Sequence, residues 1–208
     1  MAPSFYPVKE RLVDGFEGGA LLVDVGGSVG HDLDEFHKYH PDAPGELVLQ
    51  DLAAVIADAK DLDPAIKAME YDFHDEQPVK GECFPPCLVS RTTPKETVTN
   101  MEEGARAYYL HSVLHDWPDN VCQTILGRIK EAMRPGYSKI LINENCIPLQ
   151  GAWFETTGLD MTMLSLFSSK ERTEADWYNL VEGMAGLKIV KIWGAGRGVE
   201  SLIEVELP

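Results

Sequence analysis

Residues 21–30, LLVDVGGSVG, decide the fold of this chain of 208 residues. An apolar, strand-like run enters a glycine-rich turn, and a helix-like segment follows. Gly26, Gly27 and Gly30 have no Cβ, which lets a backbone pass very close to a ligand. The turn leads into a helix N-terminus, whose free N–H groups favour an anionic or polar ligand. A doubly wound α/β sheet holds a nucleotide-like cofactor in this way, although a plain tight turn has the same pattern.

An aspartate follows the glycine turn at the spacing expected of a ribose ligand. The apolar residues Leu47–Leu49 predict a second strand, which ends at Gln50 and Asp51. Asp51 lies about 20 residues past the turn, where a carboxylate can accept both hydroxyls of a ribose. The alternative is a helix N-cap, because a helical run starts at Leu52. Dinucleotide folds and S-adenosylmethionine folds share this layout, so the pattern leaves both open.

The composition is that of an ordinary globular protein with a strongly acidic balance. Hydrophobic residues make up 44% of the chain, charged residues 25%, and the net charge is −16. This charge argues against binding nucleic acid or an anionic membrane surface. No apolar run approaches the roughly 20 residues of a membrane span, and residues 1–20 do not resemble a signal peptide. The cysteines complete no zinc site with histidine. We expect one cytoplasmic domain over residues 1–208.

Strand-like and helix-like segments alternate, which implies a parallel sheet covered on both faces. Helices are predicted over residues 5–16, 32–39, 120–133 and 175–184, and from Leu52 onward. After the strand at 21–25, further strands are predicted over residues 47–49, 106–113, 139–143, 187–193 and 201–206, and residues 65–71 predict either a strand or the end of a helix. Residues 82–103 have no clear period and three prolines, and we expect a long surface loop there.

Polar side chains gather where the strand before His115 should end. The segment Tyr108–Asp119 places His111 and His115 at that carboxyl end, where open α/β sheets bind ligands. A histidine with a near-neutral pKa suits proton abstraction from a phenol or similar hydroxyl. Glu144 and Glu171 lie at loop positions where a carboxylate could fix the histidine tautomer. The alternatives are a core histidine for His111, a solvated strand end for Glu144 and a helix N-terminal charge for Glu171.

Six motifs occur in order along most of the chain. They are LLVDVGGSVGHDL (21–33), LVLQDLAAVI (47–56), YDFHDEQPVKG (71–81), ARAYYLHSVLHDWPD (105–119), ILINENCIP (140–148) and SKERTEADW (169–177). Together they resemble the plant and fungal S-adenosylmethionine-dependent O-methyltransferases of the caffeate and flavonoid type, in their fungal natural-product branch. LHDWPD and KERT are far more specific than the glycine turn. The resemblance implies an α/β, Rossmann-like, doubly wound sheet of the class I methyltransferase type, with seven mostly parallel strands and a C-terminal antiparallel hairpin.

The resemblance also implies a role for each motif residue. His115 matches the general base, and Glu144 and Glu171 match the acids that orient it. The residues that match contacts to S-adenosylmethionine are Asp24, Gly26, Gly27, Gly30, Asp51, Leu52, Asp72, Phe73 and His111. Those that match the substrate pocket are Trp117, Met163 and Phe167. The implied reaction methylates a hydroxyl of a small phenolic or polyketide-type molecule in secondary metabolism, and it needs no metal.

Three departures from the family pattern bear on this expectation. The helical N-terminal domain of the family is missing, so we expect an exposed apolar surface that pairs with a second copy or with another chain. Ser28 stands where a glycine is usual. Residues 82–103 are an insertion: a retained intron, a lid, or a replacement for missing contacts. Two other functions therefore stay open, a cyclase or pericyclic catalyst of a fungal biosynthetic pathway that transfers no methyl group, and a non-catalytic partner subunit.

Overall fold

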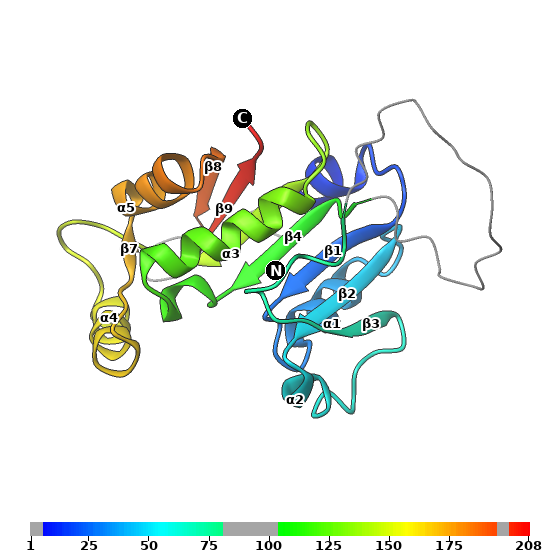
Figure 1. Ribbon diagram of the computed structural model, residues 1–208, viewed down its shortest axis with the longest axis horizontal. Coiled ribbons are helices and arrows are strands. Elements are labelled where there is room, and N and C mark those ends of the chain that lie inside the picture. The colour runs from blue at the N-terminus through cyan, green and yellow to red at the C-terminus, as the bar shows by residue number, and fades with distance from the viewer. Residues whose placement is uncertain (1–5, 81–103, 195–199) are drawn as a thin grey trace.

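A seven-stranded sheet forms the centre of the computed structural model, which describes residues 6–80, 104–194 and 200–208 (Figure 1). The strand order is β3-β2-β1-β4-β5-β9-β8. The strands are β1 (Ala20–Val25), β2 (Glu46–Asp51), β3 (Ile66–Glu70), β4 (Ala107–His111), β5 (Lys139–Glu144), β8 (Lys188–Gly194) and β9 (Ser201–Glu206). The pairs among β1 to β5 are parallel, and β9 is antiparallel to both β5 and β8. The predicted fold class is confirmed.

Helices and helical turns connect the strands. They are η1 (Lys9–Val13), α1 (His31–Tyr39), α2 (Ala53–Ile56), η2 (Leu114–Asp116), α3 (Asp119–Ala132), α4 (Phe154–Phe167), α5 (Glu174–Tyr178) and η3 (Asn179–Met184). A separate parallel pair joins β6 (Cys146–Ile147) to β7 (Arg172–Thr173). Among the residues with a described structure, no helix is long and apolar enough to cross a membrane.

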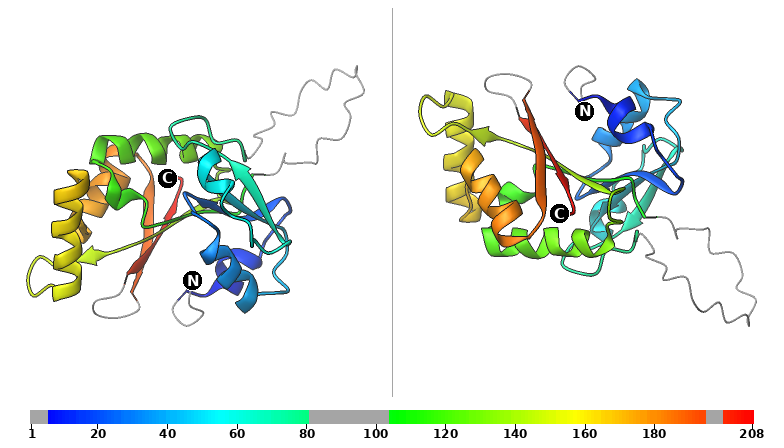
Figure 2. Two further views of the ribbon diagram at one scale, coloured as in Figure 1. Left: turned by 90° about the horizontal axis from the view of Figure 1, so that it is seen from below. Right: turned by 90° about the horizontal axis from the view of Figure 1, so that it is seen from above.

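The sheet has a hydrophobic core on each face. One core joins α3 and η3 to side chains such as Val23 and Ile142, and the other joins η1 and α1 to side chains such as Leu22 and Leu141. Figure 2 shows α3 and α1 on opposite sides of the sheet. All six residues of β1 are buried, as expected of a central parallel strand that is covered on both faces.

The chain reverses its direction of progress across the sheet between β1 and β4. From β1 it goes outward to β2 and β3, and it then returns to β4 on the other side of β1. The glycine turn after β1 and the η2 turn after β4 therefore leave the carboxyl ends of two neighbouring parallel strands. Ligands bind at such a topological switch point in open α/β sheets.

Several predicted elements need correction. The helix predicted over residues 5–16 is only η1, because Asp14 is extended and Gly15 is left-handed, with a φ of 78°. The helix predicted over 175–184 divides into α5 and the π-helical η3. Helix α4 was not predicted at all. The insertion at 82–103 and the turn between β8 and β9 lie outside the described residues.

Candidate active site

His115 lies in the short 3₁₀ turn η2, directly after β4, and its exposed fraction is only 8%. Glu144, the last residue of the neighbouring strand β5, binds the backbone of this turn. Its Oε1 accepts the backbone N–H of Leu114 at 2.8 Å and that of His115 at 3.3 Å. Two adjacent strand ends thus fix the backbone on which the predicted base stands.

Glu171 fixes the imidazole ring itself. His115 Nδ1 lies 2.8 Å from Glu171 Oε1 and 3.6 Å from Glu144 Oε2. In a neutral ring, Nδ1 carries the hydrogen for this bond, so Nε2 keeps its lone pair. Within the described ranges Nε2 forms no hydrogen bond; the carboxylate oxygen Asp116 Oδ1 lies 3.7 Å away. The structure therefore brings the three predicted residues together and leaves one ring nitrogen available to accept a proton.

Burial and charge act in opposite directions on this cluster. Burial alone would lower the pKa of His115, but the hydrogen bond with Glu171 and the charges of Glu144, Glu171 and Asp116 raise it overall. Burial raises the pKa of Glu144 to about 7, against the opposing effects of His115 and the Leu114 N–H. The second oxygens of Glu144 and Glu171 have no hydrogen-bond partner among the described atoms. These buried carboxylates favour a positive charge on the ring between them.

Among the described residues, the side chains of His115, Glu144 and Glu171 also lie close enough together to be considered as ligands of a metal ion. Their atoms lie within 4.8 Å of one another. However, the separation of 2.8 Å between Nδ1 and Glu171 Oε1 is that of a hydrogen bond, with a proton shared between the two atoms. The geometry thus fits a histidine base held by carboxylates.

The glycine turn packs closely against protein side chains, whereas the sequence predicts its close approach to a ligand. Gly26 and Gly30 have φ values of 75° and 92°, which disfavour a side chain. A Cβ on Gly27 would lie 2.5 Å from the carboxylate of Asp24. Asp51 Oδ2 accepts the N–H of Ser28 at 2.8 Å, so the end of β2 is tied to the turn. The N-cap alternative for Asp51 is wrong, because Leu52 occupies the cap position of α2.

Asp24 and Asp51 give this turn the character of a site for a cationic, hydroxyl-bearing ligand. Asp24 is fully buried, both its carboxylate oxygens lack a hydrogen-bond partner among the described atoms, and burial raises its pKa to about 8. A nearby ligand cation would stabilise its charged form. Asp51 keeps acceptor lone pairs for a ligand, because its hydrogen bonds within the described ranges are with two backbone N–H groups, those of Ser28 and Leu52. Both features fit S-adenosylmethionine, which carries positive charge and a ribose.

His111 is held differently from the expectation. Its Nδ1 lies 2.5 Å from Asp32 Oδ2 and its Nε2 lies 2.8 Å from Glu200 Oε2. These hydrogen bonds raise the pKa of His111 to about 10. Both ring nitrogens are therefore engaged by protein carboxylates, and neither is left to donate to a cofactor in this arrangement. Asp32 and Glu200 were missed in the sequence, because nothing in their local pattern indicates a histidine partner.

Phe73, one of the predicted cofactor contacts, lies beside the predicted substrate contact Trp117. Leu52 and Asp72 line one surface cavity of about 460 Å³. Phe73 meets Trp117 edge to face, with ring centroids 5.7 Å apart, and His74 meets it at 5.6 Å. The loop after β3 and the loop after η2 are thus joined by aromatic contacts, so a cofactor bound along the first would end close to the second.

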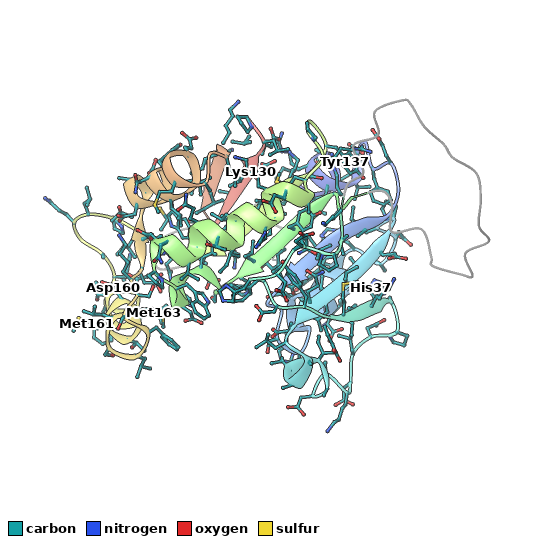
Figure 3. The ribbon with its side chains drawn as sticks, viewed as in Figure 1. His37, Lys130, Tyr137, Asp160, Met161 and Met163 are labelled. Atoms are coloured by element: carbon teal, nitrogen blue, oxygen red, sulfur yellow. The ribbon has the colours of Figure 1, made fainter. Side chains whose placement is uncertain are left out.

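Helix α4 carries the other two predicted substrate residues. Met163 is buried, whereas Phe167 is 47% exposed. Figure 3 labels Asp160, Met161 and Met163 on this helix. Asp160 Oδ1 accepts the backbone N–H of Glu171 at 2.8 Å, so α4 also helps to place the histidine's partner. Asp160 could not be found in the sequence, because α4 itself was not predicted.

Comparison with known proteins finds methyltransferases among the proteins similar to this chain. Residues 99–188 match the model of a family described as O-methyltransferase domain. Methyltransferase cfoC of Aspergillus candidus is 41% identical over 205 residues, which cover 97% of this chain and 45% of cfoC. O-methyltransferase ATR12 of Stachybotrys chlorohalonatus is 42% identical over 207 residues, which cover 99% of this chain and 46% of ATR12. Over nearly its whole length the chain is thus similar to fungal proteins named methyltransferase and O-methyltransferase.

Solved structures of similar proteins match nearly the whole chain as well. OxaC in complex with sinefungin and meleagrin is 30% identical, has a TM-score of 0.81, and is matched over 100% of this chain and 48% of its own. LepI in complex with SAM is 30% identical, with a TM-score of 0.82, and the match covers 99% of this chain and 47% of LepI. A pericyclic reaction enzyme is also 30% identical, with a TM-score of 0.81, and the match covers 99% of this chain and 48% of that enzyme. The chain spans less than half the length of these relatives.

Proposed function

We propose that this chain is an S-adenosylmethionine-dependent O-methyltransferase that acts on a hydroxyl of a small phenolic or polyketide-type molecule in fungal secondary metabolism. The observation that carries the proposal is the buried pair His115–Glu171, in which Nδ1 is hydrogen-bonded and Nε2 has no hydrogen-bond partner among the described residues. The relatives named O-methyltransferase, at about 40% identity, support the same reaction class.

The base in this proposal is Nε2 of His115. It accepts the proton of the substrate hydroxyl, which leaves the oxygen as a nucleophile. Glu171 holds Nδ1–H and stabilises the imidazolium that forms, and Glu144 adds a second negative charge while it supports the backbone of η2. Because the pKa of His115 is raised, it is a stronger base than an ordinary histidine, at the cost of a smaller neutral fraction at neutral pH.

The cofactor residues of the proposal follow the glycine turn and its neighbours. They are Asp24, Gly26, Gly27, Gly30, Asp51, Leu52, Asp72 and Phe73, with His111 beside them; Trp117, Met163 and Phe167 face the substrate. S-adenosylmethionine, when bound, supplies a methyl group that is already activated for transfer. The protein's contribution is to hold the two reactants close together and to remove the proton.

A second reaction class is favoured by one specific observation. A pericyclic reaction enzyme is as similar to this chain as OxaC is, with 30% identity and a TM-score of 0.81 in both cases. The fold therefore does not choose between methyl transfer and rearrangement. In this alternative, His115 acts as a general acid or base on a substrate whose product has the same mass. Mass spectrometry separates the two, because methyl transfer adds one methylene in mass and rearrangement adds nothing.

We also propose that the exposed apolar surface of α4 pairs with a second copy or with another chain. Phe154, Leu164 and Leu166 on this helix are at least 60% exposed. An apolar helix is normally buried, and large exposed apolar patches mark interaction sites. The chain spans about 45% of the length of cfoC, so this relative is more than twice as long as the matched part.

The first experiment compares His115→Ala with the unchanged chain. We expect methyl transfer to fall on the order of 100-fold or more, because a general base is lost. Calorimetric titration with S-adenosylmethionine should give the same affinity, since the hydrogen bonds and ion pairs of the His115 ring among the described residues are with Glu171, Glu144 and Asp116 and not with the proposed cofactor residues. His37→Ala, on α1 (Figure 3), is the matched control and should change neither quantity. Turnover of His115→Ala within a few-fold of the unchanged chain would exclude this base.

A further inference from the structure

Arg172 is a buried arginine next to the proposed catalytic cluster. It lies on the short strand β7, directly after Glu171, and only 1% of it is exposed. Its guanidinium makes more hydrogen bonds than surface charges usually do, and all of them are to the elements that follow β4. A buried cation must be paired and hydrogen-bonded to be tolerated, so these contacts explain how it is accommodated.

Arg172 holds both ends of the turn that carries His115. Its Nη1 donates to the carbonyl oxygen of Leu114 at 2.9 Å, and its Nη2 donates to that of Trp117 at 2.9 Å. Leu114 precedes His115 by one residue, and Trp117 follows it by two. Since the two carbonyls bracket the histidine, the guanidinium fixes the position and direction of this turn relative to β7.

The start of α3 is held by the same side chain. Arg172 Nε and Nη2 donate to Asp119 Oδ1 at 3.0 and 2.7 Å, and Nη2 lies 3.3 Å from the sulfur of Cys122. The ring of Trp177 packs 5.3 Å from the guanidinium carbon. A lysine keeps the charge but has one ammonium group, which cannot reach two carbonyls and a carboxylate as a planar fork does.

We propose that Arg172 is a positioning residue that sets the contact between His115 and Glu171. Glu171 and Arg172 are neighbours in the chain. Glu171 binds Nδ1 of His115, and Arg172 binds the backbone of the turn that carries His115. The bond of 2.8 Å between these two side chains therefore depends on the guanidinium. The catalytic consequence rests on the function proposed above, whereas the structural consequence for the ring of His115 does not.

Arg172→Lys tests the proposal, with the pKa of His115 as the main measurement. The pKa is followed by NMR of the chain labelled with ¹³C-histidine. The bond with Glu171 helps to raise this pKa, so its loss should lower the value by about half a unit or more. Turnover should fall on the order of 10- to 100-fold, with the Michaelis constant for S-adenosylmethionine little changed, because misplacement of a catalytic group acts on kcat. The pKa measurement remains decisive even if the chain transfers no methyl group.

Arg11→Lys is the matched control. Arg11 also makes a forked bond to a buried carboxylate, with Nε and Nη2 at 3.0 and 2.7 Å from Glu204 Oε1, but on η1 and β9. It should lower the melting temperature without moving the pKa of His115. A result in which Arg172→Lys lowers the melting temperature alone, as the control does, would overturn the proposal.

A milder variant covers the case in which Arg172→Lys does not fold. Asp119→Asn keeps the arginine and weakens its charged partner, which is one-third exposed. It should shift the pKa of His115 in the same direction by a smaller amount. An unchanged pKa in a folded Asp119→Asn chain would count against Arg172 as the residue that positions His115.

Discussion

Single residues in the turns around the site adopt a backbone conformation that usually belongs to glycine. Ser28, Ser112 and Ser168 have φ values of 55°, 52° and 54°. The left-handed region costs a non-glycine residue on the order of 1 kcal/mol. Ser28 lies in the glycine turn, where the family resemblance predicts glycine, and Ser112 lies three residues before His115. Backbone strain is therefore concentrated at the carboxyl ends of β1 and β4, where the proposed ligands bind.

Ser28→Gly should raise the free energy of unfolding by about 0.5–1 kcal/mol. It removes the backbone strain of the folded state, and this gain is larger than the loss from the greater conformational entropy of glycine in the unfolded chain. The side chain of Ser28 makes no hydrogen bond to any described residue, and the contact with Asp51 uses its backbone N–H. Urea unfolding measures the change. Ser28→Ala, which keeps a Cβ in the left-handed conformation, should bring no gain. A Ser28→Gly chain less stable than the unchanged one would contradict the strain argument.

At the scale of elements, His111 links two segments through its carboxylate partners Asp32 and Glu200, and we call these three residues the His111 clamp. It joins Asp32 on α1 to Glu200 before β9, while Asn143 on β5 donates to the same carboxylate at 2.8 Å. The hydrogen bonds with Asp32 and Glu200 raise the pKa of His111 from an unfolded value of about 6.5 to about 10. The clamp's contribution to stability is thus fully present below pH about 6.5 and is lost as the pH rises toward 10.

His111→Gln should therefore be less stable than the unchanged chain at pH 7, and the difference should shrink as the pH approaches 10. Thermal unfolding of both chains at several pH values measures this difference, and groups that titrate equally in both chains cancel. A difference that stays constant over this range would mean that the charge on His111 does not contribute.

Elements differ in how much of them the sequence predicts. The β1–turn–α1 unit was found because glycines at 26, 27 and 30 and an apolar strand are local signals. Helix α4 was missed because its apolar residues occur on all sides, so no helical period stands out. His115, Glu144 and Glu171 were predicted by family resemblance, and the structure brings them together. Asp160, Arg172 and Glu200 act through partners on other elements, which local pattern cannot indicate.

At the scale of the whole molecule, α4 leaves large apolar side chains that no described residue buries. Phe154 is 83% exposed and Leu166 is 70% exposed, at the two ends of the helix. The net charge of −16 opposes indiscriminate association between copies. An apolar surface on a strongly charged molecule is therefore best explained as an interface for one specific partner, and a second copy is the partner available in a purified sample.

Leu166→Lys tests this interface, because a charge placed in an apolar contact must be desolvated without a partner. We expect the unchanged chain to sediment as a dimer or larger species at micromolar concentration, and the variant to sediment as a monomer with the same circular dichroism. Tyr39→Lys is the matched control, since Tyr39 is 50% exposed but lies on α1. It should leave the association unchanged. A monomeric unchanged chain would contradict self-association and would leave another chain as the partner for α4.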